Sequence, residues 1–183
     1  MLASDDKKAR CDRAGSDEIR RKLLASDAAA RDAIAEYLKI PRESITFQIG
    51  QNGKPFADGI NIHFNISHSG DIVVCGISEK RLGIDTEEIR LVRESMIEFG
   101  AFDSPEYLPG YGCDKYADFL RIWTLKESFI KLNAGSIVQI RDINVKLLSE
   151  NSAEICGEPV HYKFYGIPGY VTAAMQYDSF DFE

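Results

Sequence analysis

The stretch IHFNISHSGDIVVCGI, residues 62–77, decides how the first part of the chain folds. Apolar residues recur on both sides of a short polar segment, His68-Ser69-Gly70-Asp71. Alternation of this kind around a glycine-containing segment is typical of a β-hairpin. The sequence therefore predicts a hairpin with arms at 62–66 and 72–77.

A second hairpin is predicted near the end of the chain, with arms at 160–165 and 170–177 around Pro168-Gly169. At a constant offset of 98 residues, His63 aligns with His161 and Val73 with Val171. The offset hints at an internal duplication, which would give two similar halves meeting at a pseudo-two-fold interface. Because any two buried hairpins share alternating apolar residues, chance similarity remains the alternative.

Helices and further strands surround the hairpins. Apolar residues at helical spacing predict helices, and short apolar runs predict strands. Turns and breaks follow glycine, asparagine and proline. The predicted helices are 17–39 and 119–133, the strands 45–49, 82–87 and 143–148, the turn 51–55, and the broken segment of short helices and loops 93–118.

Composition places the chain among ordinary globular proteins, with 183 residues, 44% hydrophobic and 28% charged. A net charge of −7 argues against a nucleic-acid binder. No apolar stretch approaches the roughly 18 residues of a membrane span, and the charged opening predicts a cytoplasmic protein. Four cysteines without a C-x-x-C pair predict neither a zinc site nor a disulfide framework.

Basic residues gather near the beginning of the chain. They could attract a small polyanion, or they could be the solvated face of a helix, since acidic residues alternate with them. Composition alone favours the solvated face. The residues are Lys7, Lys8, Arg10, Arg13, Arg20, Arg21 and Lys22.

The segment GIDTE, residues 83–87, places Asp85 and Glu87 on one face of a predicted strand, because alternate side chains share a face. Two carboxylates this close supply the oxygen ligands that magnesium prefers. An edge strand with solvated acids is the alternative, and for this short motif alone it is favoured.

The segment WTLKESFIK, residues 123–131, aligns Trp123, Glu127 and Lys131 along one side of a predicted helix. Glutamate and lysine would then face the same space. Taken alone, the pattern favours a simple salt bridge beneath a core tryptophan.

The segment FNISHSG, residues 64–70, contains the adjacent pair Ser67 and His68. Neighbours in a strand point to opposite faces, which argues against a catalytic Ser-His pair. Histidine, serine and backbone N–H groups suit an anion-binding site instead. A turn histidine capped by its neighbours is the alternative.

These segments also occur in a fixed order with GKP (53–55) and FDSPE (102–106). In that order, from about residue 7 to 177, the chain resembles the 4′-phosphopantetheinyl transferases of the surfactin-synthetase-activating type. The resemblance implies an α+β fold of two similar α/β halves forming a pseudo-dimer. It implies transfer of 4′-phosphopantetheine from coenzyme A to a serine of an acyl or peptidyl carrier protein, with adenosine 3′,5′-bisphosphate released.

The same resemblance implies roles for particular residues. The N-terminal half, 1–80, would bind the coenzyme A phosphates, and the C-terminal half, 81–183, would hold the metal and the catalytic groups. Mg²⁺ would be held by Asp85, Glu87 and Glu127, with Glu127 also the candidate base and Lys131 stabilising the leaving phosphate. Coenzyme A would be bound by Arg21, Gly53, Lys54, Pro55, Asn65, Ser67 and His68, and less securely by Lys7, Lys8 and Arg10.

We expect a monomer whose carrier protein docks across the interface between the halves, near residues 93–118. Relatives in this family usually have a strand before the basic segment, so we expect the first sheet to lack its opening strand. Thr86 stands where an aliphatic residue is usual, and 133–136 carries one glycine where two are frequent. Two alternatives remain: a binding module without transfer activity, and a different Mg²⁺-dependent phosphotransferase, for which no G-x-x-x-x-G-K-[ST] loop is present.

Overall fold

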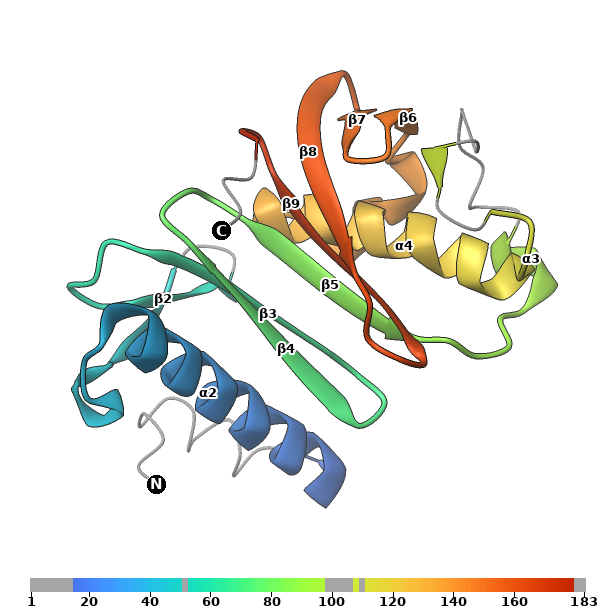
Figure 1. Cartoon of the computed structure of the whole chain (residues 1–183). Coiled ribbons are helices and arrows are strands. Elements are labelled where there is room, and N and C mark those ends of the chain that lie inside the picture. Colours follow the sequence, from blue (N-terminus) through green and yellow to red (C-terminus); the bar gives the residue numbers. More distant parts are fainter. Residues whose placement is uncertain (1–14, 51–52, 98–106, 109–110, 180–183) are drawn as a thin grey trace.

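A computed structural model describes residues 15–50, 53–97, 107–108 and 111–179, which form a mixed α and β fold (Figure 1). The helices are α2 (Asp17–Leu38), α3 (Glu94–Ile97) and α4 (Lys115–Leu132), with short 3₁₀ helices at Arg42–Ser44 and Ile137–Asp142. The strands are β1 (Phe47–Ile49), β2 (Pro55–Ala57), β3 (His63–Ser69), β4 (Ile72–Ser78), β5 (Gly83–Glu88), β6 (Val145–Ser149), β7 (Ser152–Ile155), β8 (Glu158–Tyr165) and β9 (Tyr170–Gln176). Among the described residues, no helix has the length and apolar character needed to cross a membrane.

The strands form antiparallel sheets in two parts of the molecule. In the first part β1 pairs with β2 and β3 pairs with β4. In the second part five strands form one sheet in the order β5-β9-β8-β7-β6. Helix α2 packs against the β3–β4 hairpin and α4 against β5 and β9, while β3 packs against β5 (Figure 1). The contact between β3 and β5 is where the two parts meet.

Each long helix buries an apolar face in its own core. On α4, Ile122 and Leu125 are fully buried in a cluster with Tyr162 of β8. On α2, Ile34 is fully buried in a separate cluster with Phe64 of β3. Both helices begin at a polar cap, since the Ser16 side chain accepts from the Ile19 amide and the Asp114 side chain accepts from the Tyr116 amide.

The elements repeat along the chain at a constant spacing of 98 residues. Helix α2 begins at Asp17 and α4 begins at Lys115. Phe64 pairs with Ile77 in the first hairpin, and the residues 98 positions later, Tyr162 and Met175, pair in the second. Phe47 with Ala57 and Val145 with Ile155 repeat at the same offset. The offset of 98 residues, which the sequence indicated only for the two hairpins, therefore also holds for the strand pairs β1–β2 and β6–β7.

Several predicted boundaries were wrong. Helix α4 begins at Lys115, not at 119, because Asp114 caps it there. The strand predicted at 45–49 begins at Phe47, and Ile45 follows a 3₁₀ helix. Pairing in the first hairpin continues to Ser69 with Ile72, so His68 and Ser69 belong to β3 and the turn is tighter than predicted.

Two short strands were not predicted. Strand β2 begins at Pro55, which the sequence placed in a turn, and β7 occupies residues for which no element was predicted. Both contain only three or four residues, which is too short for alternation to be visible. Gln51 and Asn52 of the predicted turn lie outside the described residues.

Candidate active site

Strand β5 carries two of the three predicted carboxylates. Asp85 and Glu87 face the same side, as their spacing predicts, whereas Thr86 points away and shares a 2.7 Å hydrogen bond with Thr172 of β9. The strand begins at Gly83, where an added Cβ would overlap the Ser128 carbonyl oxygen of α4. A glycine at this position lets β5 lie directly against the helix.

Helix α4 supplies the third carboxylate. One carboxylate oxygen from each of Asp85, Glu87 and Glu127 lies within 4.8 Å of the other two. The Glu127 side chain is oriented by Trp123, whose indole N–H donates a 2.8 Å hydrogen bond to Glu127 Oε1. Residues separated by about 40 positions in the sequence thus meet at one point.

The chemistry of this cluster suits a magnesium ion. Mg²⁺ prefers carboxylate oxygens, and three such groups converge here. Asp85 Oδ2 is buried and has no hydrogen-bond partner among the described residues. A buried carboxylate oxygen without a partner is costly, and a bound cation would satisfy it.

Lys131 completes the charged cluster. Its Nζ lies 2.5 Å from Asp85 Oδ1, 2.8 Å from Ser67 Oγ and 3.9 Å from Glu127 Oε2. The sequence suggested a simple salt bridge between Lys131 and Glu127 as the alternative, but the shorter contact is with Asp85 on another element. Lys131 therefore contacts the carboxylate cluster from α4.

One face of β3 lines the cluster from the other part of the molecule. Ser67 Oγ donates to Asp85 Oδ1 at 2.7 Å, and Ser69 Oγ donates to Glu87 Oε2 at 3.1 Å. The Asn65 side-chain oxygen accepts from the Ile84 amide at 3.1 Å. These alternate residues hold β5 against β3 through side chains.

His68 lies on the opposite face of β3. It alternates with Ser67 and Ser69 along the strand, and its side chain is exposed. The structure therefore brings Ser67 to the carboxylates and Asn65 to the backbone of β5, and leaves His68 on the face of β3 that it shares with Phe64 and Ile66, which pack with α2.

Burial changes the acidity of the carboxylates. It raises the pKa of Asp85 above its usual value, opposed by Lys131 and the Ser67 hydrogen bond. Burial, followed by repulsion from Asp85, raises the pKa of Glu127 from 4.5 to about 7. A carboxyl group with this pKa exchanges its proton near neutral pH.

The predicted GKP segment lies at the end of α4. Lys54 Nζ donates to the Lys131 carbonyl at 2.8 Å and to the Leu82 carbonyl at 3.3 Å. Its burial, with a smaller contribution from the Arg81 charge, lowers its pKa to about 8. Gly53 has a φ of 77°, a left-handed conformation that favours glycine, and Pro55 begins β2. Lys54 thus links the first part of the chain to the backbone of α4, the helix that carries Glu127 and Lys131.

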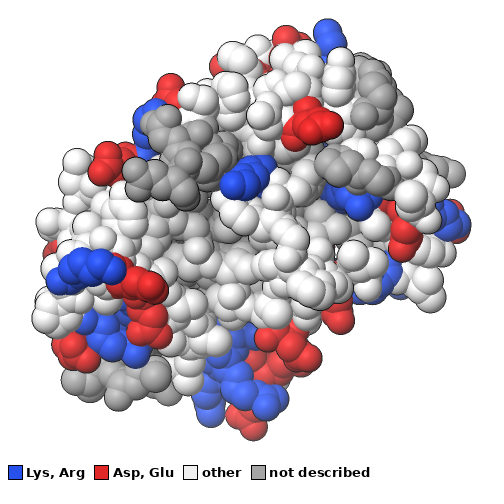
Figure 2. Space-filling view, viewed as in Figure 1, with Lys and Arg blue, Asp and Glu red and all other residues white. Residues whose placement is uncertain are grey.

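Of the basic residues near the beginning of α2, Arg20 and Arg21 are exposed and Lys22 is partly exposed. Figure 2 shows Lys and Arg side chains interleaved with Asp and Glu over the N-terminal end of α2. Lys22 pairs with Glu18 at 2.7 Å and Arg20 with Asp17 at 3.5 Å, whereas Arg21 is exposed beside them. Lys7, Lys8, Arg10 and the FDSPE segment lie outside the described residues.

Sequence reasoning missed two residues that position the cluster. Ser69 binds Glu87 and also accepts from the Glu88 amide at 3.0 Å. Arg90 donates to Glu87 Oε2 at 3.1 Å. Ser69 could have been predicted to lie beside the carboxylates, because it alternates with Ser67 along one strand. Arg90 could not, because its position depends on the direction that the chain takes after β5.

Comparison with known proteins adds independent information on the chain. A family model described as "4′-phosphopantetheinyl transferase, N-terminal" matches residues 1–81. The 4′-phosphopantetheinyl transferase Sfp of Bacillus subtilis (strain 168) is 30% identical over 180 residues, which cover 93% of this chain and 80% of that protein.

The chain belongs to the 4′-phosphopantetheinyl transferases. Two further relatives match over shorter regions: psf-1 of Bacillus pumilus, 37% identical over 120 residues, and gsp of Aneurinibacillus migulanus, 39% identical over 111 residues. These alignments cover 64% and 59% of this chain, and 52% and 46% of the relatives, about half of their length. The resemblance inferred from the ordered motifs is confirmed.

For this 4′-phosphopantetheinyl transferase family member, the Sfp alignment spans both parts of the fold. It covers enough of the chain to include the strands and the helix that form the carboxylate cluster. The cluster and the family membership are therefore two separate observations on the same protein.

Proposed function

We propose that the protein transfers the 4′-phosphopantetheine group from coenzyme A to a serine of an apo acyl or peptidyl carrier protein. The observation that carries this proposal is the meeting of Asp85, Glu87 and Glu127 within 4.8 Å, in a chain of this family. Two relatives that support it, Sfp and psf-1, are named as 4′-phosphopantetheinyl transferases.

Asp85, Glu87 and Glu127 would hold Mg²⁺. When bound, the ion would supply positive charge to neutralise the pyrophosphate of coenzyme A. The partnerless Asp85 Oδ2 and the proximity of the three groups support this assignment. The same carboxylates would repel one another if all were ionised without a cation.

The transfer step needs a proton acceptor near the carrier serine. In the proposed reaction the serine oxygen forms a bond to the β-phosphorus of coenzyme A, and the bond from that phosphorus to the bridging oxygen breaks. The serine proton passes to Glu127, and adenosine 3′,5′-bisphosphate leaves. The position of Glu127 in the carboxylate cluster and its orientation by Trp123 suit this role.

Coenzyme A would be bound mainly through its phosphates. Lys131 would move from Asp85 to the leaving phosphate, because a lysine ammonium is a compact charge on a flexible stem. The first part of the chain would supply the remaining contacts. The proposed binding residues are Arg21, Gly53, Lys54, Pro55, Asn65, Ser67 and His68, together with Lys7, Lys8 and Arg10.

The two parts of the chain would act as similar halves, residues 1–80 for coenzyme A phosphate binding and 81–183 for the metal and the catalytic groups. The recurrence of helix starts and strand registers at 98 residues supports a pseudo-dimer with approximate two-fold symmetry. The cluster lies where β3 of the first half meets β5 of the second. Clefts between halves are frequent ligand sites.

The carrier protein would dock on a monomer across this interface. Leu91, 80% exposed, and Ile89 follow β5 immediately beyond the carboxylates and present apolar surface there. Because the chain has a net charge of −7, docking on an acidic carrier would depend on apolar and local basic contacts. Arg90, between these two residues, is such a basic group.

The test is to incubate the protein with coenzyme A, Mg²⁺ and a panel of apo carrier proteins, and to weigh the carriers intact by mass spectrometry. We expect a carrier to gain one phosphopantetheine group, with an equal amount of adenosine 3′,5′-bisphosphate released. The same mixture without Mg²⁺, and one with the carrier serine replaced by alanine, are the controls. Coenzyme A binding without any mass gain on a carrier would favour the non-catalytic binding module instead.

A further inference from the structure

Two of the three carboxylates in the cluster have one oxygen held by hydrogen bonds and one oxygen left open. Asp85 Oδ1 accepts from Ser67 and Lys131, whereas Oδ2 has no hydrogen-bond partner among the described residues. Glu127 Oε1 accepts from Trp123 at 2.8 Å, and Lys131 lies 3.9 Å from Oε2, beyond hydrogen-bonding distance. In both groups the protein thus holds one oxygen and leaves the other for a ligand.

Glu87 repeats this arrangement. Ser69, the last residue of β3, donates from Oγ to Glu87 Oε2 at 3.1 Å, and Arg90 donates from Nη1 to the same atom, also at 3.1 Å. Both hydrogen bonds from the described residues to the Glu87 carboxylate therefore fall on Oε2, which leaves Oε1 open. The Arg90 side chain is 55% exposed, and water competes with an exposed ion pair. Ser69 is therefore the firmer of the two donors.

The Ser69 hydroxyl is oriented by a second contact. A serine hydroxyl has one hydrogen to donate and two lone pairs that accept. The Glu88 amide donates to Ser69 Oγ at 3.0 Å and occupies one of these lone pairs. The single hydrogen is then directed to Glu87, the residue before Glu88 on β5. One side chain of β3 thus binds both the backbone and a carboxylate of β5.

The turn after Ser69 lies closely against the second part of the molecule. Gly70 has a φ of 51°, and a Cβ added there would come within 2.8 Å of Glu88 Oε2 and 2.9 Å of the Tyr170 hydroxyl oxygen. The Tyr170 hydroxyl also accepts from the Asp71 amide at 3.3 Å. These contacts hold the backbone beside Ser69, so they keep its hydroxyl next to β5.

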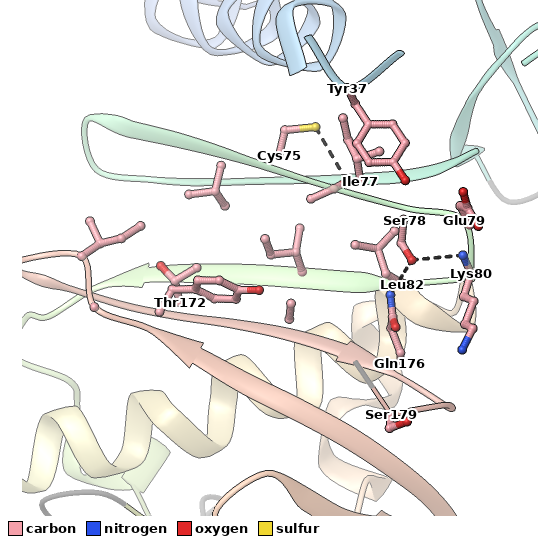
Figure 3. Close-up of a pocket in the computed structure, with 17 residues that line it drawn as sticks. Tyr37, Cys75, Ile77, Ser78, Glu79, Lys80, Leu82, Thr172, Gln176 and Ser179 are labelled. Carbon is pink, nitrogen blue, oxygen red and sulfur yellow. Dashed lines mark hydrogen bonds between the residues drawn. The ribbon is translucent and has the colours of Figure 1, made fainter. Parts of the chain in front are cut away.

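The two parts of the molecule are also joined at the opposite end of the first hairpin. There Gln176 of β9 donates to Ser78 Oγ at 2.7 Å (Figure 3). Ser78 Oγ also accepts from the Lys80 amide at 3.0 Å (Figure 3). Ser78 therefore resembles Ser69 in binding a backbone amide and a side chain of the second part, but none of its hydrogen bonds within the described residues reaches a carboxylate. It offers a matched control for Ser69.

We propose that Ser69 is a positioning residue for the metal site: it holds Glu87 Oε2 and thereby keeps Oε1 available to a cation shared with Asp85 and Glu127. The inference rests on the proposed function, because it takes these three carboxylates as the Mg²⁺ ligands. It extends that function to a residue that is neither a ligand nor part of the coenzyme-binding set. Without the hydroxyl, Glu87 rotates more freely, and the ion must pay for ordering it. Groups that orient metal ligands typically contribute about 10–100-fold in metal affinity.

The test measures cation binding directly on the full chain, without coenzyme A. Mn²⁺ is the probe, because it takes the same oxygen ligands as Mg²⁺ and its free form gives an electron paramagnetic resonance signal that is lost on binding. Ser69→Ala should weaken Mn²⁺ binding about tenfold. Ser69→Thr keeps the hydroxyl and should restore most of the affinity. Ser78→Ala should bind Mn²⁺ as the unaltered chain does.

Transfer assays supply a second measurement. In Ser69→Ala the Mg²⁺ concentration that gives half-maximal transfer should rise about tenfold, whereas the rate at saturating Mg²⁺ should fall much less. A purely structural role would instead lower the rate by the same factor at every Mg²⁺ concentration. That result would overturn the proposal.

Asp85→Asn, which removes a proposed ligand, separates failure of this inference from failure of the proposed function. If Asp85→Asn loses Mn²⁺ binding but Ser69→Ala binds as tightly as Ser78→Ala, the positioning role is wrong and the metal site stands. Weak binding by Ser69→Thr equal to that of Ser69→Ala would likewise show that the hydroxyl is not what orients Glu87. If the unaltered chain does not bind Mn²⁺, or Asp85→Asn binds it equally well, the metal site fails and the positioning role fails with it.

Discussion

Lys131 Nζ lies 2.5 Å from Asp85 Oδ1, closer than to Glu127 Oε2 in its own helix, at 3.9 Å. Asp85 is 2% exposed, so this lysine is the positive charge that partners a buried carboxylate. Removing one member of a buried pair leaves the other unpaired, at a cost of about 3–5 kcal/mol. Lys131 therefore has a structural role as well as the proposed one toward the phosphate.

Lys131→Met should lower both stability and transfer. Without Mg²⁺ the unpaired Asp85 should reduce the free energy of unfolding by about 3 kcal/mol, the lower end of that range, because the Lys131 side chain is 26% exposed. Mg²⁺ should restore more stability to the variant than to the unaltered chain, because it replaces the lost positive charge, while the transfer rate stays about 10²–10³-fold lower. Urea unfolding with and without Mg²⁺, and initial transfer rates, measure both effects.

Lys146→Met is the control, because Lys146 is exposed on β6, at the opposite edge of the five-stranded sheet from β5. It should leave both quantities within error. A Lys131→Met protein with full transfer activity would remove Lys131 from the mechanism.

Glu127→Gln should abolish most of the transfer without unfolding the protein. The amide keeps an oxygen that accepts from Trp123, but it cannot take a proton and is a weaker metal ligand. We expect a transfer rate lower by about 10²–10⁴-fold. Glu154→Gln, an exposed substitution on β7, is the matched control. Activity equal to that of the control would show that Glu127 is neither the base nor a required ligand.

The response to Mg²⁺ should depend on pH. The folded-state pKa of Glu127, about 7, lies above its usual 4.5. Between these values the folded chain holds a proton that the unfolded chain has lost, so metal-free stability falls as pH rises, by at most about 1.4 kcal/mol per unit. Mg²⁺ binds the ionised form, so its stabilisation should be larger at pH 8 than at pH 5.5.

Thermal unfolding at both pH values, with and without Mg²⁺, measures this difference. In Glu127→Gln the metal-free protein should lose most of the pH dependence over the same window. Equal shifts in Tm at pH 5.5 and pH 8 would contradict the assigned ionisation.

The carboxylate pair and the main helices could be predicted from the sequence. Asp85 and Glu87 share a face because strand alternation is local, and α2 follows from apolar spacing that ends before Pro41. The long-range position of Glu127 could not be derived from local rules, since it depends on how α4 packs on β5. The order of the motifs supplied that relationship through the family resemblance.

The contacts that support the site were the least predictable part. Lys54 was assigned to coenzyme A, and its side chain in the structure reaches the Lys131 and Leu82 carbonyls. A lysine in a turn gives no local indication of a partner 77 positions away. Backbone carbonyls at the end of a helix carry no sequence signal, so this contact is visible only in the fold.

Lys54→Met should destabilise the protein. It removes a charged donor from the C-terminal end of α4, where carbonyls lack partners within the helix, and each such hydrogen bond contributes about 1.5–3 kcal/mol. Lys146→Met, at an exposed position of β6, is the control. Urea unfolding should separate the two. Equal midpoints would show that the Lys54 contacts contribute little to the fold.

Gly83→Ala should disturb the site through the backbone alone. A Cβ at Gly83 would overlap the Ser128 carbonyl oxygen and come within 2.7 Å of the Leu132 amide nitrogen, so β5 must move away from α4. We expect a loss of about 1–3 kcal/mol in stability and a larger relative loss of Mg²⁺ affinity, because Asp85 and Glu127 lie on the two elements that separate. Gly166→Ala, where an added Cβ meets nothing within 4 Å, is the control. Calorimetric Mg²⁺ titrations of the two variants test whether the cluster needs the close contact between β5 and α4. Unchanged Mg²⁺ affinity in Gly83→Ala would mean that the helix and the strand can separate without opening the carboxylate cluster.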